Sequence, residues 1–552
     1  MEKRLIVALV LSIAVVFLWT TFIAKPPKRQ EELVPDPTPA VVASQEAAVG
    51  EAPPAAPVEE QSTPPVQEVP PEQITFLESD EMRVELSDVG GTIRRLTLKR
   101  TAVVKKESYE LVEETLPEFR PFALRESARL KFSVRDADER GVTYVGRTPE
   151  GLEITKRIGF SDEPYVLTMA LSLKETGAGP RRIDIVCGTV FGLKTGRYAS
   201  LGVDYLAGEK VKRLKEGHLK KQKGELAGES APVAWAAAKN SFFSLILIPE
   251  TRSQSVFYGT YAAPSGEPRP NAMAGLGIGA PTAGSGNEIT RHFKFYAGPK
   301  DYDILRGMGM KLDEVMGLGW FAPLSKIILR SLKFFYGICG NYGVAIILLT
   351  IAIRIVLFPL NQKSFKSMKK MQDLAPLLEP LKEKYKKDPK KLQAETMALY
   401  KKHGVNPMSG CFPMLLQMPI LIAFFQTLRS SVMLWGAHFL WIKDLSEPDA
   451  IYTLPQSLPI IGNNVNLLPI LMLIVFVLQQ KMSPASMGGG SAQAAQQQKM
   501  MSMMMPIVFG VLFYNMPSGL VLYFTVSTVL GIGQQWLVRR GSSTVPAVAR
   551  KS

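Results

Sequence analysis

The chain has 552 residues, of which 46% are hydrophobic and 21% charged, a mixture that fits membrane-embedded and aqueous parts joined in one protein. Its net charge of +15 would suit nucleic acid, but the densest basic stretch lies between two apolar runs, where it favours membrane orientation and anionic lipids instead. The three cysteines and four histidines show no metal-ligand or catalytic spacing. We therefore expect no enzyme, cofactor, metal site, disulfide framework or sequence-specific nucleic-acid partner.

The first apolar run, Leu5–Ala24, is long enough to cross a bilayer. Phe22 occupies a position that a signal-peptide cleavage site would require to be small, so we expect an uncleaved anchor over residues 1–25 with a cytoplasmic N-terminus. Residues 26–73 hold 12 of the 40 prolines. Such a composition cannot bury a core, and it predicts a disordered, extended tether.

Residues 74–300 alternate apolar and polar side chains between turn-forming residues, which predicts an antiparallel β-sandwich. The expected strands include Met82–Leu86, Thr92–Lys99, Leu152–Ile158, Tyr165–Leu173, Ser241–Ile248 and Thr290–Tyr296. Arg213–Lys223 is basic and less strand-like, so we expect a surface loop or a short helix there. The domain shows no catalytic motif, and both a ligand groove and a scaffold role remain open.

Residues 301–338 are predicted to connect this domain to the membrane. Tyr302–Met316 has apolar residues at helical spacing. Trp320–Tyr336 mixes lysine and arginine with Ile, Leu and Phe, which predicts an amphipathic helix lying in the membrane interface.

Five further apolar runs predict, with the anchor, a polytopic protein of six transmembrane helices that has a five-helix core over residues 339–538. These runs are 341–360, 411–432, 467–481, 500–516 and 518–537. Segment 361–410 carries twelve lysines against five acidic residues, a net charge of +7, whereas segment 433–466 has a net charge of −2. The positive-inside rule places the former in the cytoplasm with the basic tail 539–552, and the β domain outside.

The cytoplasmic segment 361–410 is predicted to be a helical hairpin. Lys363–Lys387 and Lys390–Lys402 have near-helical apolar spacing, and Asp388-Pro389 fits an N-cap followed by a first-turn proline. The hairpin is either a solvated charged structure or a docking platform for the ribosome, targeting machinery and incoming chains. The lysines that would serve docking are Lys363, Lys369, Lys370, Lys384, Lys386 and Lys387.

Arg354 stands inside the apolar run 342–360, where a charge costs roughly 2.5–3.5 kcal/mol on insertion scales. One interpretation is that its side chain snorkels to the headgroups. The other is a hydrated hollow, because the spans also hold Thr350, Gln417, Gln426, Asn515, Thr525, Ser527, Thr528, Gln534 and Gln535. Each of these is also compatible with a plain helix–helix hydrogen bond. The spans after the first contain no Asp or Glu, so an unpaired Arg354 would attract a polar or negative group from outside.

The predicted cytoplasmic loop 481–500 and the residues that follow it are rich in methionine. Flexible thioether side chains suit a surface that accepts many apolar sequences, and core packing is the alternative for Met503–Met505.

Several motifs, in the same order, resemble the bacterial YidC membrane-protein insertases. They are MALYKKHGVNP (397–407), GCFPMLLQMPILIAFF (410–425), LWIKDLSEPD (440–449), QQKMSP (479–484) and MPSGLVLYF (516–524). AIRIVLFPL around Arg354 matches that family's membrane-embedded arginine. The resemblance is strong over about 340–538, and the order of anchor, tether and outer β domain matches the Gram-negative type.

The resemblance implies that Arg354, Thr350 and Gln417 line a hydrophilic groove, to which we add Asn515 and Thr525 as candidates. It also implies a hydrophobic slide for substrate helices, with Met418, Pro419, Ile507, Phe509, Phe513 and Phe524 as its candidate residues. Many relatives carry paired tyrosines where this chain has Tyr523-Phe524, so the hydroxyl at 524 is missing although the ring is retained. The implied partners are nascent membrane proteins and the Sec translocon with its accessory components.

We therefore predict a non-enzymatic insertase and chaperone of the bacterial inner membrane, acting alone or with the Sec translocon. Two alternatives stay open. A small-solute transporter would also use a buried arginine, but it should show inverted repeats, and the sequence shows none. A structural tether for the β domain would leave Arg354 without a role.

Overall fold

The computed structural model describes residues 71–482, 504 and 506–540, apart from ten short gaps. These gaps are 102, 105–107, 176–181, 193–200, 223–225, 261–268, 280–287, 386–387, 407–411 and 459–461. The chain divides into two units, Met1–Gln67 and Glu68–Ser552, and only the second is described. The predicted anchor, most of the tether, the Met-rich loop beyond Met482 and the end of the tail lie outside the described residues.

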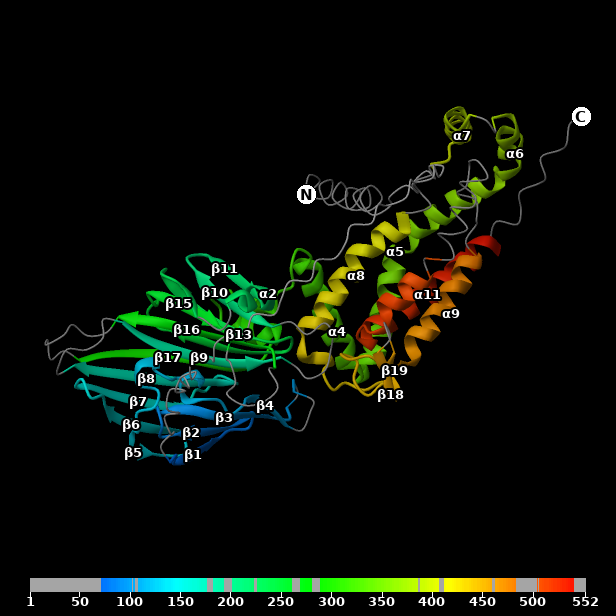
Figure 1. Cartoon of the computed structure of the whole chain (residues 1–552). Helices are drawn as coiled ribbons and strands as arrows, with labels where there is room; N and C mark the ends of the chain where they lie inside the picture. Colours follow the sequence, from blue (N-terminus) through cyan, green and yellow to red (C-terminus); the bar gives the residue numbers. More distant parts are fainter. Residues whose placement is uncertain are drawn as a thin grey trace, which may run out of the picture. The chain divides into compact units, whose positions relative to one another are not determined.

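The β domain contains three antiparallel sheets (Figure 1). A nine-stranded sheet has the order β11-β10-β13-β14-β17-β8-β7-β6-β5, and two four-stranded sheets have the orders β12-β15-β16-β9 and β1-β2-β3-β4. Strands β13 and β14 lie against β9 and β16, so two sheets pack face to face with Trp235, Phe243 and Leu245 buried in the core. Apolar side chains on alternate positions of each strand supply this core.

The strand bounds follow the predicted ones closely for the segments that alternate most clearly. The strands are β1 (Ile74–Glu78), β2 (Met82–Ser87), β3 (Thr92–Lys99), β4 (Ser108–Val112), β5 (Ser133–Ala137), β6 (Gly141–Arg147), β7 (Leu152–Phe160), β8 (Val166–Glu175), β9 (Arg182–Phe191), β10 (Gly202–Ala207), β11 (Lys210–Lys215), β12 (Ala227–Glu229), β13 (Val233–Lys239), β14 (Phe243–Pro249), β15 (Ser255–Gly259), β16 (Asn271–Gly279) and β17 (Glu288–Pro299).

The prediction of a loop or short helix over Arg213–Lys223 was wrong in its first part. Arg213 lies in β11, which pairs with β10 along its whole length, and only then do α2 (Glu216–Leu219) and a 3-10 turn follow. Strand β11 ends the order of the nine-stranded sheet, and edge strands commonly carry lysine because charge discourages pairing with other chains. The basic residues that make this segment look unlike a strand therefore lie on the edge strand of the sheet.

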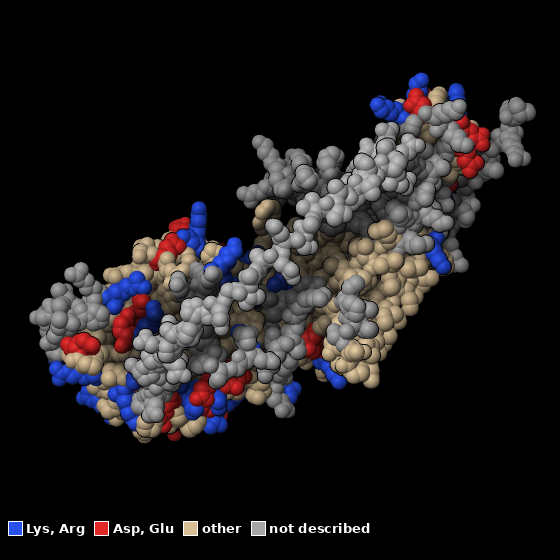
Figure 2. Space-filling view, viewed as in Figure 1, with Lys and Arg blue, Asp and Glu red and all other residues tan. Residues whose placement is uncertain are grey.

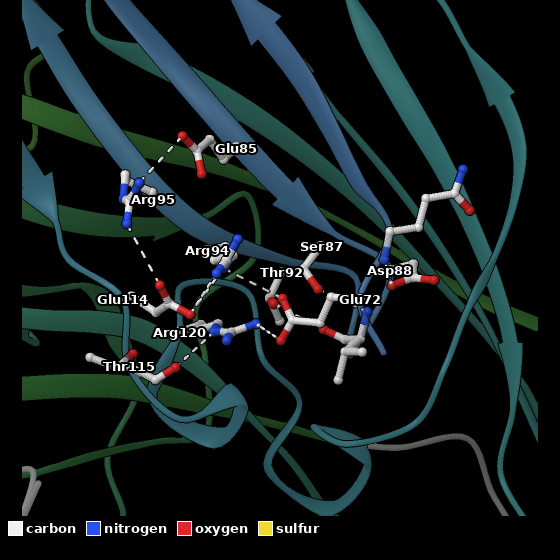
Figure 3. A network of polar contacts seen from close by, with 12 residues as sticks. Glu72, Glu85, Ser87, Asp88, Thr92, Arg94, Arg95, Glu114, Thr115 and Arg120 are labelled. Carbon is white, nitrogen blue, oxygen red and sulfur yellow. Dashed lines mark hydrogen bonds and ion pairs between the residues drawn. The ribbon is translucent and has the colours of Figure 1, made fainter. Parts of the chain in front are cut away.

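A polar network fixes the start of the described chain to the sheet β1–β4 (Figure 3). The buried Arg120 pairs through Nη1 with Glu72 Oε1 at 3.0 Å and donates through Nε to the carbonyl oxygen of Thr115 at 2.9 Å. Arg94 pairs with Glu114 at 2.7 Å and reaches Glu72 at 3.6 Å. The network thus holds Glu72, just before β1, against the β domain.

Lys156 is completely buried in β7 and holds two loops against the sheet. Its Nζ donates to the carbonyl oxygens of Gly90 at 2.6 Å and Phe122 at 2.7 Å. Both residues have left-handed backbones, with φ of 75° and 68°. Burial lowers the pKa of Lys156 to about 7, because the charged ammonium is poorly solvated there.

This buried amine predicts a pH-dependent stability. Between pH 7 and 10.5 the unfolded lysine binds a proton that the folded one does not, so the free energy of unfolding should rise with pH by up to about 1.4 kcal/mol per unit. Below pH 7 this contribution should be flat. The unfolding of the full chain, followed by tryptophan fluorescence across this window, should show the rise in the wild type and lose it in Lys156→Met. Identical pH profiles for the two proteins would contradict the assignment.

The connector differs from the single helix predicted over Tyr302–Met316. Helix α3 (Tyr302–Gly307) and a 3-10 helix (Leu312–Met316) are separated by residues 308–311, of which Gly309, Met310 and Lys311 have positive φ. The indole Nε1 of Trp235 donates to the carbonyl oxygen of Met310 at 2.9 Å, so a contact with the β domain replaces the helical bonds. Apolar spacing alone does not reveal such a break.

Helix α4 (Ala322–Cys339) is amphipathic, as predicted. Ile328, Leu329 and Leu332 are buried on one side, whereas Ile327 and Phe334 are exposed on the other. The exposed apolar side suits a membrane interface.

The remaining helices form a bundle with a hairpin at one end of α5 (Figure 1). They are α5 (Tyr342–Asp373), α6 (Ala375–Lys384), α7 (Pro389–Lys402), α8 (Phe412–Ser430), α9 (Leu467–Met482), a helical segment over 506–514 and α11 (Ser518–Arg540). Strands β18 (Ala450–Leu458) and β19 (Gly462–Asn466) join α8 to α9. Among the described residues, Tyr342–Met371 and Ser518–Leu537 are long and apolar enough to span a membrane, and Leu467–Met482 is a shorter apolar helix.

Helix α5 does not end at the predicted boundary near residue 360 but continues through Pro359 to Asp373. Membrane helices tolerate prolines, although Pro359 cannot bond the carbonyl oxygen of Ile355 four residues earlier. Next to the proline, Gln534 Nε2 donates to the carbonyl oxygen of Phe358 at 3.1 Å and links α5 to α11. The first arm of the hairpin is therefore split at Leu374 between α5 and α6. The predicted N-cap is confirmed, since the Asp388 side chain accepts from the amide of Lys391 at 3.1 Å.

Candidate functional site

One face of α11 carries polar or small residues at four-residue spacing, namely Tyr523, Ser527 and Gly531. Residues spaced by four lie above one another on a helix. This face contacts α5, which supplies Arg354, and α8, which supplies Gln417. The polar side chains of three helices thus meet at one point inside an apolar bundle.

Arg354 is held by Ser527 and by no acidic residue of the described bundle. Its Nε and Nη2 lie 3.1 Å and 2.9 Å from Ser527 Oγ, and Nη2 also donates to the Ser527 carbonyl oxygen. The described stretches 342–372, 412–430, 467–482, 506–514 and 518–540 contain no Asp or Glu. The charge is therefore oriented by neutral acceptors and is not neutralised.

Gln417 completes the contacts of Ser527. Its Nε2 donates to Ser527 Oγ at 3.1 Å and to the Tyr523 hydroxyl. On the next turn of α11, a Cβ added to Gly531 would lie 3.2 Å from both Arg354 Nη2 and Gln479 Nε2. The missing side chain of Gly531 therefore lets the guanidinium approach the backbone of α11 closely.

Part of the guanidinium remains available. An arginine presents five N–H donors, and in the described part of the chain Nη1 donates to no protein group. Nη1 is not fully buried, since it has no hydrogen bond among the described residues and is still absent from the fully buried side-chain atoms that lack one. The two N–H donors of Nη1 are thus partly exposed and make no hydrogen bond to the described residues.

The other candidate groove residues are placed differently. Thr350 Oγ1 donates to the carbonyl oxygen of Ile346 at 2.6 Å, and Thr525 Oγ1 to that of Val521 at 2.7 Å. Both hydroxyls therefore bond within their own helices, a frequent arrangement for threonine. Asn515 is half-buried in the turn that follows residues 506–514. The structure brings together Arg354 and Gln417, through a serine that we had noted only as one polar residue among several.

The candidate slide residues divide into exposed and packed ones. Met418 and Ile507 are 41% and 59% exposed, whereas Phe513 is 2% exposed. The Phe524 ring packs 5.9 Å from Phe509 and 5.0 Å from Phe513, measured between ring centroids. Pro419 lies half-buried in α8 beside Met418.

Apolar side chains are exposed along the whole bundle, where Figure 2 shows a surface largely without charge. They include Ile355, Val356, Met418, Ile470, Ile474, Leu478, Ile507, Val508, Val511, Leu512, Val529, Trp536 and Leu537. Charged residues gather instead over the β strands and the α6–α7 hairpin (Figure 2). An apolar surface of this extent requires lipid or protein to cover it.

Four of the six candidate docking lysines lie on α5 and α6. Lys363, Lys370 and Lys384 are exposed, and Lys369 is half-buried. Lys386 and Lys387 lie outside the described residues.

Comparisons with known proteins cover nearly the whole chain. The family model for the 60Kd inner membrane protein matches residues 334–544, and that for the YidC periplasmic domain matches residues 75–330. The chain belongs to the YidC family of membrane protein insertases. Its β domain is therefore periplasmic, and its helical part belongs to the inner membrane.

Two relatives named membrane protein insertase YidC show the extent of the similarity to the YidC family. The one from Geobacter sulfurreducens is 33% identical over 594 residues, covering 99% of this chain and 100% of the relative. The one from Geobacter metallireducens is 33% identical over 579 residues with the same coverage. A galactose mutarotase-like protein from Lactobacillus casei matches 41% of this chain at 12% identity, but with a TM-score of only 0.32.

Proposed function

We propose that this chain accepts the polar flank of a nascent membrane protein at Arg354 and releases the adjoining apolar segment into lipid. The observation that carries this proposal is the half-occupied guanidinium, which Ser527 orients while Nη1 stays open. A hydrogen bond to a charged group contributes about 1.5–3 kcal/mol, so the site would offset part of the desolvation of a polar or acidic flank. The apolar segment then gains roughly 25 cal/mol per Å² of surface removed from water.

The exposed side chains of Met418 and Ile507 support a path from this site into lipid. A client helix that leaves the groove would exchange contacts with these apolar side chains for contacts with acyl chains. The packed rings of Phe509, Phe513 and Phe524 would act as the rigid wall behind the path.

The proposed topology has six transmembrane helices with both termini in the cytoplasm. The net charges of +7 on segment 361–410 and −2 on segment 433–466 support this orientation. Lys363, Lys370 and Lys384 would then face ribosomes, targeting factors and anionic lipids, and the Sec translocon would share some clients. Insertion would draw on hydrophobic transfer and, for negative flanks, on the membrane potential.

Site-specific photocrosslinking tests this function. A photoreactive residue at Met418 should form adducts with ribosome-bound nascent chains of a small membrane protein, and one at the exposed Glu153 of β7 should not. The absence of adducts at Met418 for clients of every length, with capture of a partner at Glu153, would favour a tethering role for the β domain instead.

A further inference from the structure

The segment between α8 and β18 displays two large apolar side chains at the tip of a tight turn. The amide of Phe439 donates to the carbonyl oxygen of Ile442 at 2.9 Å, and the amide of Ile442 donates back at 2.8 Å. Leu440 and Trp441 occupy the two positions between them and are 73% and 41% exposed. Neither residue contributes to the Arg354 site.

The backbone of this tip is unfavourable for the residue it carries. Leu440 has a φ of 51°, in the left-handed region, which costs a residue with a Cβ roughly 1–2 kcal/mol. Two-residue turns normally place Gly, Asn or Asp at such positions. An exposed leucine thus adds a hydration cost to a conformational one, and strain of this kind usually marks a functional contact.

The base of the turn is rigid. Asp444 accepts from the amide of Gly436 at 2.9 Å, and the carbonyl oxygens of Leu445 and Glu447 accept from the amides of Gly519 and Ser518 at 2.9 Å and 2.8 Å. The latter two residues begin α11. The tip therefore projects from a base that is bonded to the bundle and does not belong to a free loop.

The indole of Trp441 is tied to the start of α9. Its Nε1 donates to Asp449 Oδ2 at 3.1 Å, and the same oxygen accepts from the amide of Leu468 at 2.6 Å. The polar edge of the ring is thus satisfied, and the exposed part is apolar. The exposed Ile470 and Ile474 follow on α9, so the tip continues the apolar surface of the bundle.

The tip lies at the periplasmic end of the bundle. Asn341 Nδ2 donates to the carbonyl oxygen of His438 at 3.2 Å, and Asn341 immediately precedes α5, on the side from which the periplasmic domain enters. Lys443 is exposed beside the tip, and within the described residues no ion pair includes it.

We propose that Leu440 and Trp441 insert into the headgroup layer of the periplasmic leaflet, where the Lys443 ammonium is attracted to anionic lipids. Tryptophan favours this layer because its ring is amphipathic, and a neighbouring lysine adds attraction to anionic lipids. The contact would fix the depth of the first turns of α9 and α11, to which the base is bonded. The proposal relies on the chain belonging to a family of membrane proteins and does not rely on the proposed role of Arg354.

A fluorescent probe tests the insertion in the full chain. Cys187, Cys339 and Cys411 are replaced by alanine, and Leu440→Cys or, as a control, Glu153→Cys is labelled with the environment-sensitive dye NBD in sealed vesicles. We expect a blue-shifted emission at 440 that nitroxides on lipid headgroups quench several-fold more strongly than the emission at 153. Lys443→Glu should weaken the quenching in phosphatidylglycerol vesicles and leave it unchanged in phosphatidylcholine vesicles.

A second measurement avoids a probe at the tip itself. Brominated lipids should quench the tryptophan emission of the unlabelled wild type more than that of Trp441→Phe. Trp235→Phe removes a buried indole of the β domain, so it should leave the amount of emission that the lipids quench unchanged. Equal quenching at 440 and 153 in both kinds of vesicle would overturn the proposal. Shielding of the 440 probe only when a client is added would overturn it in favour of a protein-docking surface.

Discussion

Arg354→Glu should slow the insertion of a client with an acidic translocated flank by roughly ten- to a hundredfold. The loss of one charge-assisted hydrogen bond from Nη1 costs about 1.5–3 kcal/mol, and each 1.4 kcal/mol corresponds to a factor of ten. A matched client with an uncharged flank should lose much less. Insertion of both clients is measured as protease-protected fragment in vesicles that hold equal amounts of each variant.

Two variants distinguish an effect of the charge at position 354 from an effect of the net charge of the protein. Lys366→Glu changes the net charge equally at an exposed position of the same helix, and it should leave the difference between the two clients as in the wild type. Arg354→Lys keeps the charge but not the planar fork that contacts Ser527, so an intermediate loss is expected. If Arg354→Glu slowed both clients equally, the site would not be recognising the flank.

Ser527→Val should lower the free energy of unfolding by about 2–4 kcal/mol and impair insertion of both clients. Valine is one methyl group larger than serine and has the shape of threonine. It removes the oxygen that accepts from Arg354 Nε and Gln417 Nε2, which leaves a buried charge with fewer partners. Unfolding in mixed detergent micelles, followed by tryptophan fluorescence, measures the change.

The matched control lies at the next position of α11. Thr528 is equally buried, but its Oγ1 donates only to the carbonyl oxygen of Phe524 at 2.7 Å, so Thr528→Val should cost about 1 kcal/mol or less. Ser527→Thr, which keeps the oxygen, should stay close to the wild type. Equal losses for Ser527→Val and Thr528→Val would show that Ser527 does not position Arg354.

The sequence predicted the element types where one physical pattern dominates. Thr92–Lys99 alternates except at the pair Arg94-Arg95, and its strand bounds were predicted without error. Asp388 was correctly assigned as a cap because its side chain can accept from the backbone. The edge strand β11 and the break at Met310 were missed. The break at Met310 depends on a contact with Trp235, which is distant in sequence and absent from the local pattern. Strand β11 forms a tight hairpin with its neighbour β10, and it was missed because the basic residues of an edge strand hide the alternation.

The candidate site shows the same limit. Arg354 was singled out because a charge in an apolar run is costly wherever its partners lie. Its partner was not identified, because the alignment of α5 with α11 decides whether Ser527 or Thr525 faces it, and both are plausible from sequence. The spacing of Tyr523, Ser527 and Gly531 was the available signal, since it defines one polar face on α11.

Insertion by the purified chain alone tests the central claim most directly. A short single-span client is presented to sealed vesicles that contain only this protein, without Sec translocon or nucleotide, and its protease-protected fragment is measured. We predict protection well above that in empty vesicles, and a loss of that excess for an acidic-flank client when the vesicles carry Arg354→Glu. Protection equal to that of empty vesicles, or unaffected by Arg354→Glu, would contradict insertion through this site.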